Sequence, residues 1–385
     1  MMEGLREIHQ ICIEKNLQFV SYRLPGNQDC TTLIQEDSTL EHFFSVKDMP
    51  HEKGFIMAPF DIRNGHRYMM IRPDLQLNGT DPGPEFLKKL ERIPANPVPV
   101  WKESMPLITG REKYISQVRA IKSSIANGAF QKAVLSRILV LEGDHISLVP
   151  DIFRTICRLH PNSFVYLFKS GSQFWMGASP EPLLRLKDER VSTVSLASTR
   201  PYGEEHMDIN HWTAKEVLEQ EYVTRYIHDA LYLFGIRDYR VSSPYVKKAG
   251  NLVHLRTDFS FALERIGDRL WDLIEALHPT PAVAGQPKED AIAFIKELEP
   301  HDRAYYTGFL GPVDNGRELD LFVNLRCMKI TPSCLALYVG GGITLDSDPA
   351  DEWDETSLKA RTLLEVISGF IKNPELRNAA HATYR

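Results

Sequence analysis

Two apolar runs joined by a short polar turn set the strongest limit on how this chain can fold. Residues 164–168 and 173–177 are rich in aromatic and apolar side chains, and the Lys-Ser-Gly-Ser segment between them favours a tight reversal. Further strand-like runs lie at 183–186, 190–196, 252–255, 259–263, 319–326 and 334–339. Hairpins of this kind outnumber strand–helix–strand units in the sequence. We therefore predict an α+β fold, with large antiparallel sheets in a sandwich and helices packed outside.

Helical periodicity marks the segments that should cover these sheets. Apolar residues recur at three- and four-residue spacing in 5–15, 111–126, 270–277 and 291–298. The longest signal runs from Thr213 to about residue 234, where Thr213 and Glu216 form a capping-box pattern and Gly235 follows as a stop. A last helix is predicted to begin after the turn-rich segment 346–349.

The composition excludes several classes of protein. The 385 residues are 43% hydrophobic and carry a net charge of −6, so no broad basic field exists, and we expect neither a nucleic acid nor a membrane as partner. The five cysteines are scattered without a CxxC pair, the start lacks a signal-peptide layout, and no apolar run approaches the length of a membrane span. We expect a cytoplasmic monomer that needs no obligate protein partner.

A proline-rich stretch divides the chain into two sections. Residues 93–106 contain four prolines and have the composition of a linker. We predict a variable N-terminal section, 1–100, packed on the same body as a catalytic domain, 101–375.

Two carboxylates and a lysine share one face of the predicted last helix. Glu352, Glu355 and Lys359 are spaced i, i+3 and i+7, so they lie within about two turns of one another. Such carboxylates could bind a divalent cation, and the ammonium could bind an anion. The alternative is a solvated first turn, whose acids stabilise the positive end of the helix dipole. The local sequence alone favours this alternative.

Three further charged residues stand where a strand or a helix could carry them into a site. Lys132 opens an apolar strand and could be a partly desolvated base, although a lysine at a strand end is usually exposed. Glu181 lies between Pro180 and Pro182, which fix the backbone on either side, and could equally be an ordinary turn carboxylate. Glu219 lies past the first turn of the long helix, where the dipole explains it less well, although a solvated face remains the simpler interpretation.

Rigid and glycine-rich segments complete the set of candidates. His278 begins a nearly uncharged, proline-containing run, 278–285, which suggests a wall shaped around a ligand. Three glycines at 340–342 follow a strand expected to end at Val339, and bare backbone N–H groups there could hold an anion. Arg326 ends another predicted strand and can direct its guanidinium at a carboxylate. Together these residues suit a dianionic ligand bridged by a metal.

The order of these motifs resembles that of the chorismate-utilising enzymes, and within them most closely the isochorismate synthases. The matching segments are 131–137, 177–181, 196–200, 215–221, 278–283, 303–311, 326–327, 340–349 and 352–359. They follow the family's order across about residues 110–370, whereas the first hundred residues match less clearly. The resemblance implies the chorismate-utilising-enzyme fold, similar to anthranilate synthase component I, and it makes 101–375 the chorismate-binding domain.

The resemblance also implies roles for individual residues. Chorismate would bind with Mg²⁺ on its ring carboxylate, the ion being held by Glu219 and Glu355, with Glu352 acting through water. Lys359 would pair with the ring carboxylate. The other substrate-binding residues would be Arg326, Tyr306, Gly341 and Gly342 at the enolpyruvyl carboxylate, His278 and Thr199 around the ring, and also Ala197.

The implied reaction adds water at ring C2 while hydroxide leaves from C4. Lys132 would deprotonate the water and Glu181 would protonate the departing hydroxyl. Lys132 argues against an anthranilate-type enzyme, because those relatives do not keep this lysine. The alternatives are a salicylate synthase, which would also eliminate pyruvate, and a non-catalytic chorismate-binding homologue. Menaquinone and siderophore synthesis both use this chemistry, so both pathways stay open.

Two positions depart from the family pattern. Ser198 stands where the family usually has glycine, which places a hydroxymethyl group beside the expected pocket. Gln220 replaces the common histidine that follows the metal-binding Glu219. The first departure bears on the fit of the pocket, and the second on the groups that support Glu219.

Overall fold

Two antiparallel sheets form the frame of the computed structural model, which describes residues 3–39, 41–49, 52–101, 105–249, 252–314 and 316–371. In these residues every strand pairing is antiparallel. Sheet A has the order β15 (Gly285–Gln286), β7 (Lys132–Glu142), β19 (Cys334–Ile343), β18 (Cys327–Ile330), β9 (Gln173–Ser179), β8 (Phe164–Ser170), β1 (Gln18–Arg23), β2 (Thr31–Gln35) and β6 (Leu75–Asn78). Sheet B has the order β12 (Arg240–Val241), β14 (Leu252–Ala262), β11 (Arg190–Pro201), β10 (Pro182–Lys187), β17 (Glu318–Val323), β16 (Phe309–Asp314), β4 (Gly54–Ala58), β5 (Tyr68–Ile71) and β3 (His42–Phe43), and β13 (Tyr245–Ala249) pairs with β14.

The hairpin predicted at 164–177 is present as β8 and β9. Ser170 pairs with Gln173, so Gly171 and Ser172 form the two-residue turn. Gly171 has a φ of 56°, in the left-handed region that glycine adopts at low cost. The prediction of an α+β fold built on large antiparallel sheets is confirmed.

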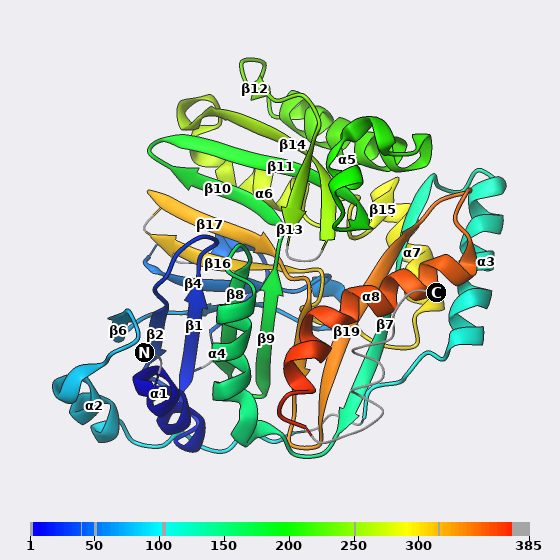
Figure 1. The fold of residues 1–385 in the computed structure, drawn as a ribbon. Coiled ribbons are helices and arrows are strands. Elements are labelled where there is room, and N and C mark those ends of the chain that lie inside the picture. The colour runs from blue at the N-terminus through cyan, green and yellow to red at the C-terminus, as the bar shows by residue number, and fades with distance from the viewer. Residues whose placement is uncertain are drawn as a thin grey trace.

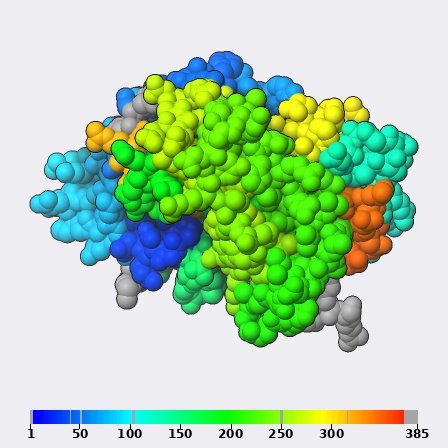
Figure 2. All heavy atoms as spheres, turned by 90° about the horizontal axis from the view of Figure 1, so that it is seen from above, coloured from blue at the N-terminus to red at the C-terminus, as the bar shows by residue number. Residues whose placement is uncertain are grey.

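Helices cover the outer faces of both sheets, as Figure 1 shows. Apolar side chains pack α1 (Glu3–Glu14), α2 (Gly83–Arg92), α4 (Val149–Leu159) and α8 (Pro349–Ile367) on sheet A. They pack α5 (Ala214–Leu233) and α6 (Leu270–Leu277) on sheet B, and α3 (Arg111–Ala126) and α7 (Lys288–Leu298) beside β7. In the view from above (Figure 2), residues of the green segment that includes α5 occupy the middle of the face, and α3, α7 and α8 lie together at one end.

An aromatic layer joins the two sheets. Phe164 and Trp175 of sheet A and Phe55 and Phe322 of sheet B belong to one buried cluster, in which the rings of Phe164 and Phe322 stack with centroids 4.2 Å apart. Burial of rings of this size is the main contribution that a sandwich core makes to stability. The sheets are therefore held as one body, and residues at their facing ends keep fixed relative positions.

Helix α8 is held against β7 through one arginine. Arg137 of β7 donates hydrogen bonds from Nε to Thr356 Oγ1 and from Nη2 to Ser357 Oγ, at 2.8 and 2.9 Å. Its guanidinium also lies 3.8 Å from the ring centroid of Trp353. At the helix start, the Asp348 side chain accepts from two backbone N–H groups. These contacts fix the rotation of α8 and thus the face that it turns toward the sheets.

Several predicted boundaries were wrong. The strand predicted at 319–326 ends at Val323, and Arg326 lies beyond it with a φ of 49°. The strand predicted to end at Val339 continues to Ile343, so the glycines at 340–342 belong to β19 and pair with residues 134–136 of β7. Helices α2 and α4 were not predicted. Residues 102–104 of the predicted linker, and 372–375 of the predicted domain, lie outside the described residues.

The strands of the first hundred residues are hydrogen-bonded into both sheets. β1 pairs with β8 in sheet A, and β4 pairs with β16 in sheet B. The division at about residue 100 stays a prediction. Within the described part of the chain, no helix combines the length and the apolar character needed to cross a bilayer.

Candidate active site

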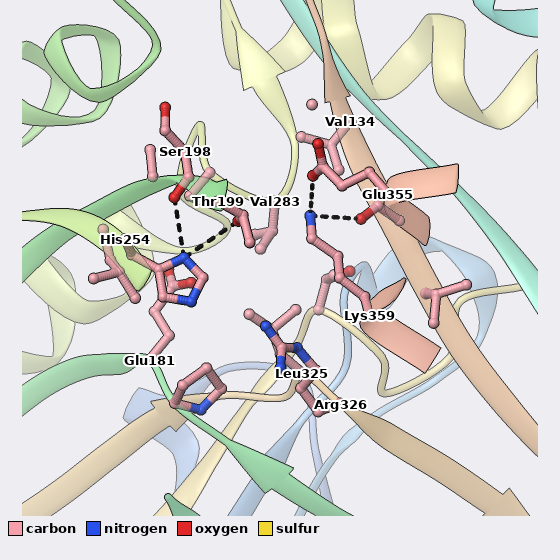
Figure 3. Close-up of a pocket in the computed structure, with 18 of the residues that line it drawn as sticks. Val134, Glu181, Ser198, Thr199, His254, Val283, Leu325, Arg326, Glu355 and Lys359 are labelled. Carbon is pink, nitrogen blue, oxygen red and sulfur yellow. Dashed lines mark hydrogen bonds and ion pairs between the residues drawn. The ribbon is translucent and has the colours of Figure 1, made fainter. Parts of the chain in front are cut away.

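A cavity lies where the ends of the two sheets meet α5 and α8 (Figure 3). The residues that line it come from β7, β11, β14 and β19, from the loops around 180, 283, 306 and 326, and from both helices. Among them are nine residues that the sequence nominated: Glu181, Ala197, Thr199, Glu219, Tyr306, Arg326, Gly342, Glu355 and Lys359. The fold thus gathers residues from positions 181 to 359 around one space.

Four nominated residues do not line this cavity. Lys132 and Glu352 lie behind its wall, each beside residues that do line it. Gly341 faces Glu352, because a Cβ on this glycine would come 3.0 Å from Glu352 Oε2. His278 is directed elsewhere: its Nε2 lies 3.1 Å from the carbonyl oxygen of Pro59. The expected contacts of Gly341 and His278 with a ligand are therefore not supported by their positions.

The histidine that does line the cavity is His254, which sequence reasoning missed. Its Nδ1 lies 3.0 Å from the carbonyl oxygen of Ser198 and 3.2 Å from Thr199 Oγ1. Both contacts are drawn as dashed lines in Figure 3. A carbonyl only accepts, so Nδ1 carries the proton and Nε2 is an acceptor. Nε2 is buried without a partner. Burial lowers the pKa of His254 to about 3, with Arg326 adding to the effect, so the ring is neutral.

Lys132 and Glu219 form a buried ion pair at the cavity wall. The Lys132 side chain is fully buried, and its Nζ donates to Glu219 Oε1 at 2.8 Å. Ser198 Oγ lies 3.0 Å from the other oxygen, Oε2. Burial opposes the charge of Glu219, but Lys132 and the other donors outweigh it and hold the pKa of Glu219 below its usual range. The lysine is thus buried as proposed for a base, rather than exposed at a strand end.

Gly342 makes room for this pair. A Cβ at Gly342 would come 2.7 Å from Glu219 Oε1 and 2.8 Å from Lys132 Cε. Real Cβ atoms do not approach other atoms so closely, so any larger residue would push the two side chains apart. The absence of a side chain at Gly342 thus lets the ends of Lys132 and Glu219 meet at this point.

The acids of α8 are each paired with a lysine as well. Lys359 Nζ lies 2.7 Å from Glu355 Oε1 and donates to the carbonyl oxygen of Gly340 at 3.0 Å. Glu352 Oε1 lies 3.3 Å from Lys215 Nζ, while Oε2 is buried without a partner. Burial, and then the charge of Glu355, raises the pKa of Glu352 to about 7, against the opposing effect of Lys215.

The three acids suit a hard divalent cation by their chemistry, although they are not yet arranged around one point. Among the described residues, no three carboxylate, imidazole or thiol groups converge closely enough to hold a metal ion. Each predicted ligand turns one oxygen to a lysine instead. The unpartnered Oε2 of Glu352 and the mutual repulsion of Glu352 and Glu355 are features that a cation would relieve. The donor set therefore fits Mg²⁺.

Glu181 is a carboxyl group in an apolar setting. It lies between β9 and β10, where its backbone carbonyl accepts from Val323 N and its backbone N–H donates to Ser179 Oγ. The side chain lines the cavity, and only 7% of the residue is exposed. Burial raises the pKa of Glu181 to about 8, even though Lys132, Lys359 and Arg326 act in the opposite direction. At neutral pH this group is mostly a protonated acid.

Arg326 supplies a cation for an anionic ligand. Its Nη1 donates to Thr362 Oγ1 at 3.0 Å, and no carboxylate of the described residues lies within ion-pair distance of its guanidinium. Burial lowers the pKa of Arg326 to about 10, which still leaves it charged at neutral pH. Arg326, Thr307 and Ser198 all line the cavity at positive φ, between 49° and 59°. Strain of this kind concentrates at binding sites, where the surrounding structure sustains it.

The fold and the cavity define a class: an α+β protein that gathers a protonated acid, a buried lysine, two further cations and a set of carboxylates at one cavity. The family model described as "Chorismate binding enzyme" matches residues 86–368. The chain belongs to this family.

Three relatives illustrate the breadth of that family. The isochorismate synthase MenF of Bacillus subtilis (strain 168) is 28% identical over 265 residues, which are 67% of this chain and 56% of MenF. Anthranilate synthase component 1 of Pseudomonas aeruginosa is 30% identical over 272 residues, or 67% of this chain and 54% of that protein. The chain thus spans little more than half the length of these relatives. The structure is also similar to a crystal structure described as a putative 2,3-dihydroxybenzoate-specific isochorismate synthase, DhbC, from Bacillus anthracis. The two superpose with a TM-score of 0.73 and 23% identity, over 94% of this chain and 99% of the other, so they share a fold.

Proposed function

We propose that this protein is an isochorismate synthase, which isomerises chorismate to isochorismate with Mg²⁺ as its cofactor. The observation that carries the proposal is Glu181, a carboxyl group that burial keeps protonated near neutral pH at the wall of a cavity furnished with cations. A protonated acid can deliver the proton that a leaving hydroxyl needs. The similarity to the isochorismate synthase MenF supports the same activity.

The reaction replaces one hydroxyl by another. Water adds at ring C2, the ring double bonds shift, and the C4 hydroxyl departs, so one water enters and one leaves. Glu181 would donate its proton to the departing C4 oxygen. Lys132, which pairs with Glu219 as an ammonium, would first release a proton to solvent, and its neutral amine would then accept a proton from the attacking water. The two groups exchange these protons with solvent before the next turnover.

Other residues would hold the substrate in place. Arg326 and Lys359 line the cavity and would each pair with one of the two carboxylates of chorismate. His254 would accept a hydrogen bond from a ring hydroxyl through Nε2, because its Nδ1 proton is already bound to the Ser198 carbonyl. Tyr306, with its hydroxyl next to Gly340, would stand beside the enolpyruvyl group.

Glu219 and Glu355 would hold Mg²⁺, with Glu352 acting through water. The ion, when bound, would restrain the ring carboxylate and withdraw electron density from the ring. To bind it, Glu219 and Glu355 would have to share or give up their contacts with Lys132 and Lys359.

A product assay tests the proposal. Purified protein is incubated with chorismate and Mg²⁺, and the products are resolved by liquid chromatography, with Glu181→Gln as the matched control. Isochorismate from the wild type alone is the expected result. Salicylate with pyruvate would identify a salicylate synthase, and binding of chorismate without turnover would identify a non-catalytic homologue.

A further inference from the structure

The strand β11 is interrupted at the point where it borders the cavity. Its pairing with β14 shifts between Ala197 and Arg200, and His254 is the β14 residue opposite the interruption. Ser198 lies within this bulge with a φ of 59°. Bulges beside active sites commonly redirect a side chain. Here the bulge turns the side chain of Ser198 toward α5 and its carbonyl toward His254.

The hydroxyl of Ser198 reaches two acceptors on α5. Oγ lies 2.7 Å from the carbonyl oxygen of Glu216 and 3.0 Å from Glu219 Oε2. A hydroxyl has one proton to donate, and an ionised carboxylate is the stronger acceptor. Because Lys132 already holds Oε1, the carboxylate of Glu219 is restrained at both oxygens. No other described donor lies within hydrogen-bond distance of Oε2.

The backbone conformation at position 198 is unfavourable for serine, so we expect its hydroxyl to make a contact that offsets the strain. Residues other than glycine rarely adopt a φ of 59°, because the Cβ atom makes this conformation strained. The carbonyl of Ser198 would accept from His254 Nδ1 with any side chain at this position. The hydroxyl contacts with the Glu216 carbonyl and with Glu219 Oε2 therefore distinguish serine from glycine here, and of the two acceptors only Glu219 belongs to the cavity.

We propose that Ser198 is a positioning residue, whose hydroxyl orients Glu219 for binding of the divalent cation. The inference rests on the proposed role of Glu219 as a ligand of Mg²⁺. A carboxylate that is already held in one rotamer loses less side-chain entropy when it binds an ion. Groups that orient metal ligands in this way typically change metal affinity by about 10- to 100-fold when they are removed.

Two substitutions separate the effect of the Ser198 hydroxyl on metal binding from the effect of the backbone strain. Ser198→Ala removes the hydroxyl and keeps the strained Cβ, whereas Ser198→Gly removes the hydroxyl and also relieves the strain. Binding of Mg²⁺ alone, without chorismate, is measured by isothermal titration calorimetry, and thermal stability is measured in EDTA. Ser192→Ala, on the same strand but outside the cavity lining, is the matched control.

We expect both Ser198 variants to bind Mg²⁺ about tenfold more weakly than the wild type, while in EDTA the glycine variant is the more stable of the two. Wild-type affinity in both variants would overturn the inference. The inference would also be overturned if the alanine variant bound Mg²⁺ weakly and the glycine variant bound it as well as the wild type. Backbone strain, and not the hydroxyl, would then determine the affinity. If the alanine variant fails to fold, the glycine variant alone still decides.

One further variant separates this inference from the proposed function. Glu219→Gln is expected to abolish measurable Mg²⁺ binding. If it binds Mg²⁺ as the wild type does, the assignment of Glu219 as a ligand is wrong and the inference falls with it. If Glu219→Gln loses the ion and the Ser198 variants do not, only the role of Ser198 is wrong.

Discussion

Replacing Glu181 by glutamine tests the physical basis of the proposed acid. Burial raises the pKa of this carboxyl from an ordinary value of 4.5 to about 8 in the folded protein. The folded state therefore holds a proton at pH values where the unfolded chain has lost it. The contribution of Glu181 to stability is complete below pH 4.5 and is lost as the pH rises through 8.

The size of the effect follows from the two pKa values. Each pKa unit corresponds to about 1.4 kcal/mol, so the whole change amounts to about 5 kcal/mol, of which about 4 kcal/mol falls between pH 5 and pH 9. Glutamine has nearly the same shape and does not titrate. The stability of Glu181→Gln relative to the wild type should therefore rise by up to about 4 kcal/mol over this range.

Urea denaturation in EDTA measures this difference at intervals from pH 5 to pH 9. Glu142→Gln, at the exposed end of β7, is the matched control and should follow the wild-type curve. The same pKa predicts that wild-type turnover falls above about pH 8, where the acid loses its proton. Parallel stability curves for the wild type and Glu181→Gln would mean that Glu181 is ionised in the folded protein, and would refute its role as an acid.

Four other substitutions test the roles of neighbouring residues. Lys132→Gln should reduce turnover by about 100-fold or more, because the base is lost, and full turnover in a product assay would contradict the base assignment. The same variant should lower stability in urea denaturation by about 3 kcal/mol, because Glu219 stays buried without its ion pair. His254→Gln should reduce kcat/KM by at least about tenfold, whereas His278→Gln should lower stability and leave kcat/KM within about twofold; the reverse pattern would restore the role expected from the sequence. Gly342→Ala should weaken Mg²⁺ binding, measured by calorimetry, because its Cβ displaces the Lys132–Glu219 pair; unchanged binding would show that the pair can move without loss.

The elements that the sequence predicted well are those with local signals. The helix predicted at 111–126 has those bounds as α3, since its apolar periodicity and the glycine that ends it are both visible in the chain. Helix α4 was missed although its buried residues Val149, Ile152, Phe153, Ile156 and Cys157 recur at three- and four-residue spacing; its first turn contains Pro150. A proline is tolerated in the first turn, and the packing of α4 on sheet A stabilises the rest.

The boundaries of the strands around the cavity depend on tertiary contacts. Arg326 was placed at the end of a strand, yet it adopts a left-handed conformation between β17 and β18. Nothing in an arginine's sequence neighbourhood predicts that conformation. The glycines at 340–342 were expected to leave the strand, because glycine weakens strands in general. They stay in β19, where the missing side chains admit Lys132, Glu219 and Glu352.

Among the site residues, too, those close together in the sequence could be predicted to meet, and those far apart could not. Glu355 and Lys359 lie four residues apart on a helix, so their spacing alone predicted a shared face, and they are in contact at 2.7 Å. Lys132 and Glu219 are 87 residues apart, and only the resemblance to a known family suggested that they share a site. His254 stands inside an apolar strand, in Leu-Val-His-Leu, and a histidine in such a run was the one available signal.

The charges of the site lead to a final prediction about how its two ligands bind. Three acids of the site are paired with three lysines: Glu219 with Lys132, Glu352 with Lys215, and Glu355 with Lys359. Mg²⁺ entering alone would meet three ammonium groups, and a dianion entering alone would meet three acids. Bound together, the two ligands add no net charge, and each offsets the repulsion that the other meets.

Binding of Mg²⁺ and chorismate should therefore be cooperative, and linkage requires that each raise the affinity of the other by the same factor. A coupling of about tenfold corresponds to about 1.4 kcal/mol, which is modest for charges in a partly desolvated cavity. Calorimetric titration of Glu181→Gln, which should bind without turnover, measures both affinities with and without the second ligand. Lys215→Met would remove one ammonium from the acids and should strengthen binding of Mg²⁺ alone while weakening the coupling. Independent binding of the two ligands would mean that the lysines move away before either ligand arrives, and that the paired arrangement does not control access to the site.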